Sequence, residues 1–217
     1  LEEGEIPLSV ELDPEAEAVV VRTAEETDFE AKMARRIRTS GCAVGTVFGD
    51  VMERFEGVRL PEGEVRVSDL MALTAMIARM PSLYLAAGAI HGAALCAGRR
   101  GLVYVEDVGR HNAVDKIAGW MRLNAVGGGD KLLHTTGRLT SEMVIKTALM
   151  GIPALASRSG FTAEGVALAR ACGLTLIGRL KGSRFLCLSG EGRLVRDVAA
   201  EDRGEDPRHV RKGAREG

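Results

Sequence analysis

The sequence predicts an α/β protein in which strands and helices alternate along most of the chain. Between residues 102 and 177, short apolar runs are followed three times by longer segments whose apolar residues recur at helical spacing. Gly151, Pro153 and Gly173 interrupt these patterns where an element should end. Such alternation is typical of a sheet with helices on its faces.

The elements follow in chain order from the same patterns. The expected strands are 18–21, 102–105, 131–135, 154–157 and 174–177, with a closing hairpin of 185–188 and 193–198. The expected helices are 68–80, 112–120, 141–150 and 162–172, with these residues as N-terminal caps: Ser68, Asn112, Thr140 or Ser141, and Thr162. Asp115 could complete a capping box with Asn112. The small-residue stretch 86–97 fits either a helix or a strand.

The domain organisation expected from composition has three parts. Residues 1–63 form an N-terminal portion that includes a cysteine loop, residues 64–199 form the main α/β domain, and residues 200–217 form a charged, disordered tail. The chain starts at Leu1 rather than methionine, so we expect the N-terminal portion to be truncated.

Composition excludes several function classes. The net charge is −1, so no global basic field indicates nucleic-acid binding. The most apolar stretch, 83–97, is interrupted by Gly88, His91 and Gly92, which argues against a membrane span. Four scattered cysteines do not form a disulfide framework, and this favours a reducing cytoplasm.

Two segments could bind an anion. In 106–111, an acidic pair, a glycine, an arginine and a histidine lie between a predicted strand and a predicted helix, and Arg110 and Lys116 flank the helix start. The alternative is a surface loop whose charges pair with each other. The second segment, 178–184, carries three basic residues and two glycines after a strand, which suits a phosphate but also a plain basic hairpin. Arg138, next to Gly137 and ahead of a helix start, is a third candidate.

Cys42 is the best candidate nucleophile. It lies between Gly41 and Gly45, and the preceding arginines could lower the pKa of its thiol. Taken alone, a single cysteine is more often a buried packing residue. Three other cysteines lie in apolar patterns and are expected in the core: Cys96, Cys172 and Cys187.

Motifs for other chemistries are missing. The histidines at 91, 111, 134 and 209 share no ligand spacing with the cysteines, so no protein-ligated metal is expected. GxGxxG and Walker loops are absent, which argues against NAD or ATP chemistry.

Five motifs together resemble the FdhD family of formate dehydrogenase accessory proteins. They are RTSGCAVG around Cys42, GAIHGAAL around His91, EDVGRHNAVDK from Glu106, SEMVIKTALMGIPALAS from Ser141 and LTLIGRLKGSRF from Leu174. They occur in the family's order and cover most of residues 36–194. The resemblance implies a cytidine-deaminase-like three-layer sandwich with a mixed sheet, a homodimer and a cytoplasmic location.

The same resemblance implies a function and a site. Members of the family are sulfur carriers, so Cys42 would take persulfide sulfur from a cysteine desulfurase. The sulfur would pass to the molybdenum bis(molybdopterin guanine dinucleotide) cofactor, bound as a substrate, before this cofactor enters formate dehydrogenase. The implied contacts to the cofactor are Arg179, Leu180, Lys181, Gly182, Ser183, Arg184, Asp107, Arg110, His111 and Arg138.

One departure from the family pattern keeps an alternative open. The family commonly has C-x-x-C where this chain has Cys42-Ala43-Val44-Gly45, so a neighbouring resolving thiol is absent. The chain could therefore be a cofactor-binding chaperone that transfers no sulfur. A metal-dependent hydrolase on a deaminase-like scaffold ranks lower, because His91 is followed by Gly92 and Ala93 and the His-x-Glu motif is missing.

Overall fold

A computed structural model describes residues 9–22, 36–38, 46–48 and 55–198. The chain divides into two compact units, residues 1–50 and 51–217, and each is described by itself. The predicted cysteine loop and the charged tail lie outside the described residues.

The first unit contains two antiparallel strand pairs. β1 (Ser9–Asp13) pairs with β2 (Ala18–Arg22), which confirms the strand predicted at 18–21. β3 (Arg36–Arg38) pairs with β4 (Thr46–Phe48), although the sequence predicted neither strand. The connection between β3 and β4 contains Cys42 and lies outside the described residues.

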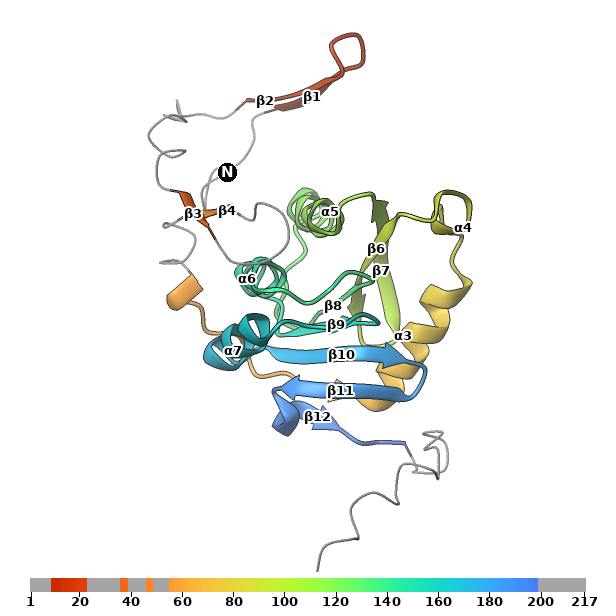
Figure 1. Ribbon diagram of the computed structural model, residues 1–217, viewed down its shortest axis with the longest axis vertical. Helices are drawn as coiled ribbons and strands as arrows, with labels where there is room; N and C mark the ends of the chain where they lie inside the picture. Colours follow the sequence, from red (N-terminus) through yellow and green to blue (C-terminus); the bar gives the residue numbers. More distant parts are fainter. Residues whose placement is uncertain (1–8, 23–35, 39–45, 49–54, 199–217) are drawn as a thin grey trace, which may run out of the picture. The chain divides into compact units, whose positions relative to one another are not determined.

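The second unit is built on a mixed six-stranded sheet with the order β11-β10-β9-β8-β6-β7 (Figure 1). β8, β9 and β10 are parallel to one another, whereas β6 is antiparallel to both of its neighbours and β11 is antiparallel to β10. The strands are β6 (His91–Ala97), β7 (Arg100–Asp107), β8 (Leu132–Thr135), β9 (Ala154–Ser157), β10 (Thr175–Lys181) and β11 (Arg184–Ser189).

Helices cover both faces of this sheet (Figure 1). α5 (Arg110–Leu123), α6 (Ser141–Leu149) and α7 (Ala163–Cys172) lie on one face, and α3 (Val67–Arg79) lies on the other. Leu73 of α3 packs with Ala94 and Cys96 of β6, and Leu70 packs with residues of β9 and β10. The expected mixed α/β sandwich of three layers is therefore confirmed.

The predictions for 131–173 agree closely with the structure. Thr162 caps α7, because its hydroxyl accepts a hydrogen bond from the Gly165 N–H at 3.1 Å. Gly173 ends α7 with a φ of 72°, a conformation that glycine adopts without steric cost. Thr140 is the N-cap residue of α6, but its side chain makes no capping bond.

Two predicted helix starts are wrong. α5 begins at Arg110 with Gly109 as its N-cap, and Asn112 instead donates to Asp107 Oδ1 at 3.2 Å. Asp115 forms no capping box, because both of its carboxylate oxygens accept from Lys146 at 2.5 and 2.6 Å. α3 begins at Val67, and Asp197 binds the N–H of Ser68 at 3.0 Å. In α3 a carboxylate from beyond the helix thus accepts from an N–H of the first turn, whereas at α5 the Asp107 carboxylate accepts from the N–H of the N-cap residue, Gly109.

One predicted strand pairing is wrong, and one open assignment is decided by the structure. The predicted hairpin of 185–188 with 193–198 is wrong, because β12 (Leu194–Val195) pairs in parallel with β5 (Val65–Arg66). A 3-10 turn, Glu191–Arg193, redirects the chain after Gly190, whose φ is 72°. The stretch 86–97 divides at Gly88 into the end of the short helix α4 (Tyr84–Ala87) and the strand β6.

Candidate functional site

The sheet topology places most of the predicted site residues along one edge. The parallel strands β8, β9 and β10 end at this edge, with Thr135, Ser157 and Lys181 as their last residues. β7 runs in the same direction, because it and β8 are both antiparallel to β6, so its last residue, Asp107, lies at the same edge. We call these strand ends and the connections that follow them the carboxyl edge. Ligands of open α/β sheets commonly bind at such an edge.

Hydrogen bonds tie the connections of the carboxyl edge to one another. The buried Ser157 hydroxyl donates to the Gly137 carbonyl at 2.6 Å and accepts from the Ser159 N–H at 2.9 Å. The Leu139 N–H donates to the Gly160 carbonyl at 2.9 Å, which adds a backbone bond between the same two connections. These bonds give the edge a preorganised shape, as a binding surface requires.

A cleft of about 480 Å³ opens on this edge, and we call it the basic cleft. It is lined by Arg158, Ser159, Gly160, Arg179, Lys181 and Arg184. Its lining holds four cations and no carboxylate, so the cleft favours an anionic ligand. The sequence reasoning missed Arg158. The available signal was its position directly after the predicted strand 154–157 and before Ser159 and Gly160.

The segment 178–184 is mostly a β-hairpin, a form that the sequence analysis left open. β10 continues through Lys181, Gly182 and Ser183 form the turn, and Arg184 opens β11 opposite Lys181. The hairpin brings Lys181 and Arg184 into the basic cleft together. Leu180 points elsewhere, since its side chain is 1% exposed and packs in the core.

Arg179 has an unusual backbone. Its φ is 54°, within an irregularity of the β10–β11 ladder, and its N–H donates to the Ser159 carbonyl at 2.9 Å. The left-handed conformation costs a non-glycine residue about 1–2 kcal/mol. The bulge directs this arginine into the basic cleft, and strain of this kind often accompanies a binding site.

Asp107 organises the other end of the edge. Its Oδ2 lies 2.7 Å from Lys116 Nζ, and its Oδ1 accepts from the Gly109 N–H at 2.8 Å. The hydrogen bond from Lys116 and then that from Gly109 hold the pKa of Asp107 below its ordinary value. Lys116 is therefore occupied by the protein, as the charge-pairing alternative for this loop expected.

Arg110 lies between the two ends of the edge. Its side chain passes over Gly137 so closely that a Cβ atom at residue 137 would lie 2.8 Å from Arg110 Cβ. Arg110 Nε is buried and has no hydrogen-bond partner among the described residues. Arg138 follows Gly137 and is exposed, so its charge faces solvent at the same edge.

His111 faces α6. Its Nε2 lies 2.7 Å from Glu142 Oε2, a close contact that lacks the alignment of a hydrogen bond and is an ion pair only when the imidazole is protonated. Burial, followed by the charge of Arg110, lowers the pKa of His111. The same two causes lower the pKa of His91, whose Nδ1 lies 3.5 Å from Thr136 Oγ1. Neither histidine lines the basic cleft.

The described cysteines are not suited to nucleophilic chemistry. Cys96 is 1% exposed, and burial raises its pKa to about 12. Burial also raises the pKa of Cys172 and of the half-buried Cys187.

In the parts of the chain that the structure describes, no group of three His, Cys, Asp or Glu side chains could hold a metal ion. None of the helices in these parts has the length and apolar character that a bilayer span needs.

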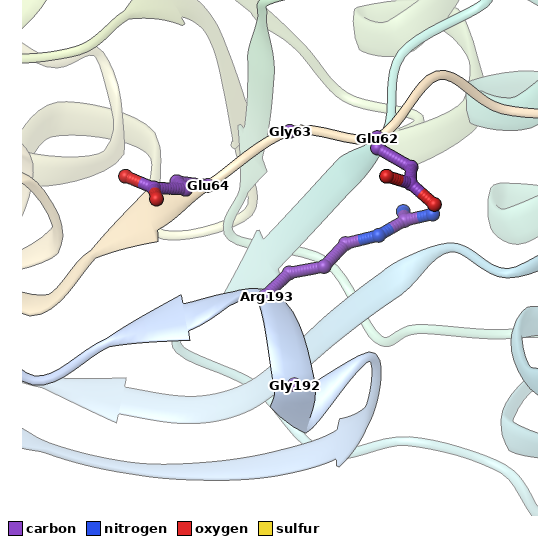
Figure 2. A pocket seen from close by; sticks show the side chains of 5 residues that line it. All are labelled: Glu62, Gly63, Glu64, Gly192 and Arg193. Carbon is purple, nitrogen blue, oxygen red and sulfur yellow. The ribbon is translucent and has the colours of Figure 1, made fainter.

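A second cleft, of about 380 Å³, lies at the opposite edge of the sheet, near the amino ends of β9 and β10 (Figure 2). It is lined by Glu62, Gly63, Glu64, Gly192 and Arg193. Arg193 donates to the Gly173 carbonyl at 2.6 Å, and Figure 2 shows its side chain extending toward Glu62. We call it the acidic cleft, because its two carboxylates outnumber its one cation.

Comparisons with known proteins agree with the resemblance seen in the sequence. The chain is 31% identical over 169 residues to "Sulfur carrier protein FdhD" of Wolinella succinogenes, covering 76% of this chain and 58% of that protein. It is 39% identical over 144 residues to the protein of the same name from Nocardia farcinica, covering 65% and 51% respectively. The chain thus spans between half and three-fifths of the length of these curated relatives.

A solved structure shares the fold. The crystal structure of a putative formate dehydrogenase accessory protein from Desulfotalea psychrophila aligns with a TM-score of 0.71 at 26% identity, covering 88% of this chain and 75% of that one. The sequence model of the FdhD/NarQ family matches residues 2–195. From this match and the fold together, the chain belongs to the FdhD/NarQ family.

Proposed function

We propose that this protein is a sulfur carrier that serves formate dehydrogenase. Cys42 takes a sulfur atom from a cysteine desulfurase and passes it to a molybdenum bis(molybdopterin guanine dinucleotide) cofactor held on the carboxyl edge. The names of the relatives support the general role. The observation that carries the cofactor part is the basic cleft, where four cations from the ends of β9 and β10 and the start of β11 line one cavity.

The cleft suits the diphosphate of a guanine dinucleotide. Guanidinium groups form paired hydrogen bonds to phosphate oxygens, and Lys181 adds a compact positive charge. Arg110 and Arg138 extend the positive charge along the same edge toward β7. The ligand would bind as a substrate that leaves again, so exposed cations are better suited than a closed, fully buried pocket.

Loading of sulfur on Cys42 is a thiol–persulfide exchange. The Cys42 thiolate attacks the outer sulfur of the desulfurase persulfide, an S–S bond breaks, and the desulfurase cysteine leaves as a thiolate. Cys42 then carries the persulfide. Residues Arg35, Arg36 and Arg38 precede Cys42, and their charge would favour its thiolate.

Release of the sulfur as sulfide needs two electrons. A thiol can supply them by attacking the inner sulfur of the Cys42 persulfide, which releases hydrosulfide and leaves a mixed disulfide on Cys42. A second thiol then restores the Cys42 thiol. Because Gly45 stands where a resolving cysteine would lie and the described cysteines have raised pKa values, these thiols would come from another molecule.

The missing cysteine also favours a second candidate function, a chaperone that binds the cofactor without transferring sulfur. The two functions differ in their need for Cys42. A Cys42→Ala variant of a pure chaperone would still activate the dehydrogenase, whereas the same variant of a sulfur carrier would not.

Intact-mass spectrometry after incubation with a cysteine desulfurase and cysteine tests sulfur loading directly. We expect the wild-type protein to gain the mass of one sulfur atom and the Cys42→Ala variant to gain none. Cys187→Ser is the matched control, because Cys187 is the least buried of the other cysteines, and it should load like the wild type. No gain in the wild type would reject the carrier and leave the chaperone.

A further inference from the structure

The connection between α3 and β6, residues 81–90, is attached to the rest of its unit in an unusual way. We call this connection the strap. It begins at Pro81, contains α4 and turns at Gly88, whose φ is 70°. Its Leu83 and Tyr84 side chains are 63% and 54% exposed. Its backbone bonds from Ala86, Ala87 and Gly88 all end within the strap, so they do not attach it to the sheet.

A single carboxylate makes the attachment. Glu106 Oε1 accepts from Ser82 Oγ at 2.5 Å, and Glu106 Oε2 accepts from the Leu83 N–H at 2.9 Å. Among the described residues, these are the hydrogen bonds that join residues 81–90 to the rest of the unit. Glu106 is the next-to-last residue of β7, so the strap is fixed at the carboxyl edge.

Glu106 is in turn held by Tyr104. The Tyr104 hydroxyl donates to Glu106 Oε1 at 2.8 Å, and the ring lies over Gly92 of β6. A Cβ atom at residue 92 would lie 2.5 Å from this hydroxyl, so the arrangement requires glycine there. Burial opposes ionisation of Glu106, but the bonds from Ser82, Leu83 and Tyr104 outweigh it, and the pKa of Glu106 lies below its ordinary value.

The strap leads directly into the carboxyl edge. His91 and Gly92 follow it, and Gly92 exchanges hydrogen bonds with Thr136 at 2.9 and 3.0 Å, immediately before Gly137 and Arg138. The positive charge of Arg110 acts on His91, since it contributes to the lowered pKa of that histidine. The position of the strap therefore affects His91 and Gly92 and, through Thr136, the connection after β8 that carries Arg138.

We propose that Glu106 is a positioning residue whose carboxylate fastens the strap to β7 and thereby holds His91 and Gly92 in place for ligand binding at the carboxyl edge. This inference rests on the proposed function, because it deepens the account of the same site. Glu106 itself touches no ligand in this account. It acts through Ser82, Leu83 and Tyr104.

The test compares Glu106→Gln with wild type by hydrogen exchange and by titration with GDP, the nucleotide portion of the proposed cofactor. The amide side chain keeps the shape but removes the negative charge, so the charge-assisted bonds from Ser82 and Leu83 that hold the strap are replaced by weaker neutral ones. We expect the amides of residues 83–90 to exchange about tenfold faster and the Kd for GDP to rise about tenfold, the effect of losing roughly 1.4 kcal/mol of preorganisation.

Two further variants make the test specific. Tyr104→Phe removes one of the three bonds to Glu106 and should give a smaller effect of the same kind. Asp69→Asn is the matched control, because Asp69 binds Arg99 at 3.1 Å at the far end of β6, and it should change neither measurement.

The outcomes are distinguishable. Unchanged exchange of residues 83–90 in Glu106→Gln would overturn the attachment, and faster exchange with an unchanged Kd would overturn the positioning role. A loss of thermal stability alone would likewise reduce Glu106 to a structural residue. If the wild type does not bind GDP, the proposed ligand is wrong, and so is the positioning role, whereas the exchange data still decide whether Glu106 fastens the strap.

Discussion

The two edges of the six-stranded sheet present clefts of similar size and opposite charge. The basic cleft at the carboxyl edge gathers cations from β9, β10 and β11 without a carboxylate in its lining. At the amino edge, Arg193 is bound to the Gly173 carbonyl and lies in a cleft with Glu62 and Glu64. A cleft lined by cations alone is available to an anionic ligand, whereas in the second cleft two carboxylates accompany a cation that is already bound to a backbone carbonyl.

The largest predicted effect concerns a buried histidine of β8, the strand next to β9 in the sheet. His134 is 3% exposed, and burial, together with the charge of Arg158, lowers its pKa to about 4. Because the unfolded chain binds this proton near pH 6.5, the folded protein should lose stability as pH falls from 6.5 to 4, by up to about 3 kcal/mol from this group. Urea unfolding at several pH values would measure the loss, and His134→Gln should reduce it.

The comparison with the variant isolates His134 from the carboxylates that titrate in the same pH range. An identical pH dependence in the wild type and in His134→Gln would contradict the assignment. Arg158→Gln should raise the pKa of His134 in an NMR titration, whereas Arg193→Gln, at the other edge, should leave it unchanged.

The next effect tests the basic cleft itself. Neutralising both Lys181 and Arg184 as glutamines should raise the Kd for GDP about 30-fold, since each exposed charged contact contributes about 1 kcal/mol. Calorimetric titration with GDP measures this change in Kd. Arg193→Gln is the control at the amino edge and should bind GDP with the Kd of the wild type. An equal rise in the Kd of the double variant and of Arg193→Gln would mean that GDP does not distinguish the two clefts.

A smaller effect tests the packing between Arg110 and the connection after β8. Gly137→Ala places a Cβ atom 2.8 Å from Arg110 Cβ, and we expect a loss of about 2 kcal/mol in the free energy of unfolding. Gly119→Ala in α5 is the matched control, because nothing lies within 4 Å of its added Cβ, and it should stabilise by about 0.5–1 kcal/mol. Denaturant unfolding measures both changes. If the unfolding midpoints of the two variants shift in the same direction, this packing is contradicted.

The smallest effect on stability concerns the backbone of Arg179. In Arg179→Gly the strain of its φ of 54° is relieved, but the unfolded chain gains freedom, so the free energy of unfolding should change by less than about 1 kcal/mol. The Kd for GDP should nevertheless rise severalfold, because a cation is lost from the basic cleft. If Arg179→Gly keeps the wild-type Kd for GDP, the bulge at residue 179 does not contribute to binding.

Local patterns allowed much of the fold to be predicted. β8, α6, β9 and α7 were found within one or two residues, because their signals, such as the Thr162 cap and the Gly173 stop, lie within the element itself. The pairing of β12 with β5 joins residues far apart in the sequence, and no local pattern indicates it. The start of α3 was missed for the same reason, since its capping carboxylate belongs to Asp197.

The candidate site could be predicted in part. Arg179, Lys181 and Arg184 were proposed because they follow a predicted strand together with two glycines and because the segment resembles the family's, and the structure places them in one cleft. Arg158 was missed because a single arginine after a strand is a weak signal until the parallel order of β9 and β10 brings it beside the hairpin. The role of Glu106 depends on Ser82, 24 residues earlier in the sequence, and so could not be seen in its own motif.

NMR chemical-shift mapping of the labelled protein during titration with GDP shows whether the carboxyl edge holds the nucleotide portion of the ligand. If it does, the shifts of residues 136–139, 158–161 and 178–184 change in a saturable way, while those of residues 62–64 and 190–193 stay constant. Changes confined to residues 62–64 and 190–193, or no saturable change at the carboxyl edge, would contradict this placement.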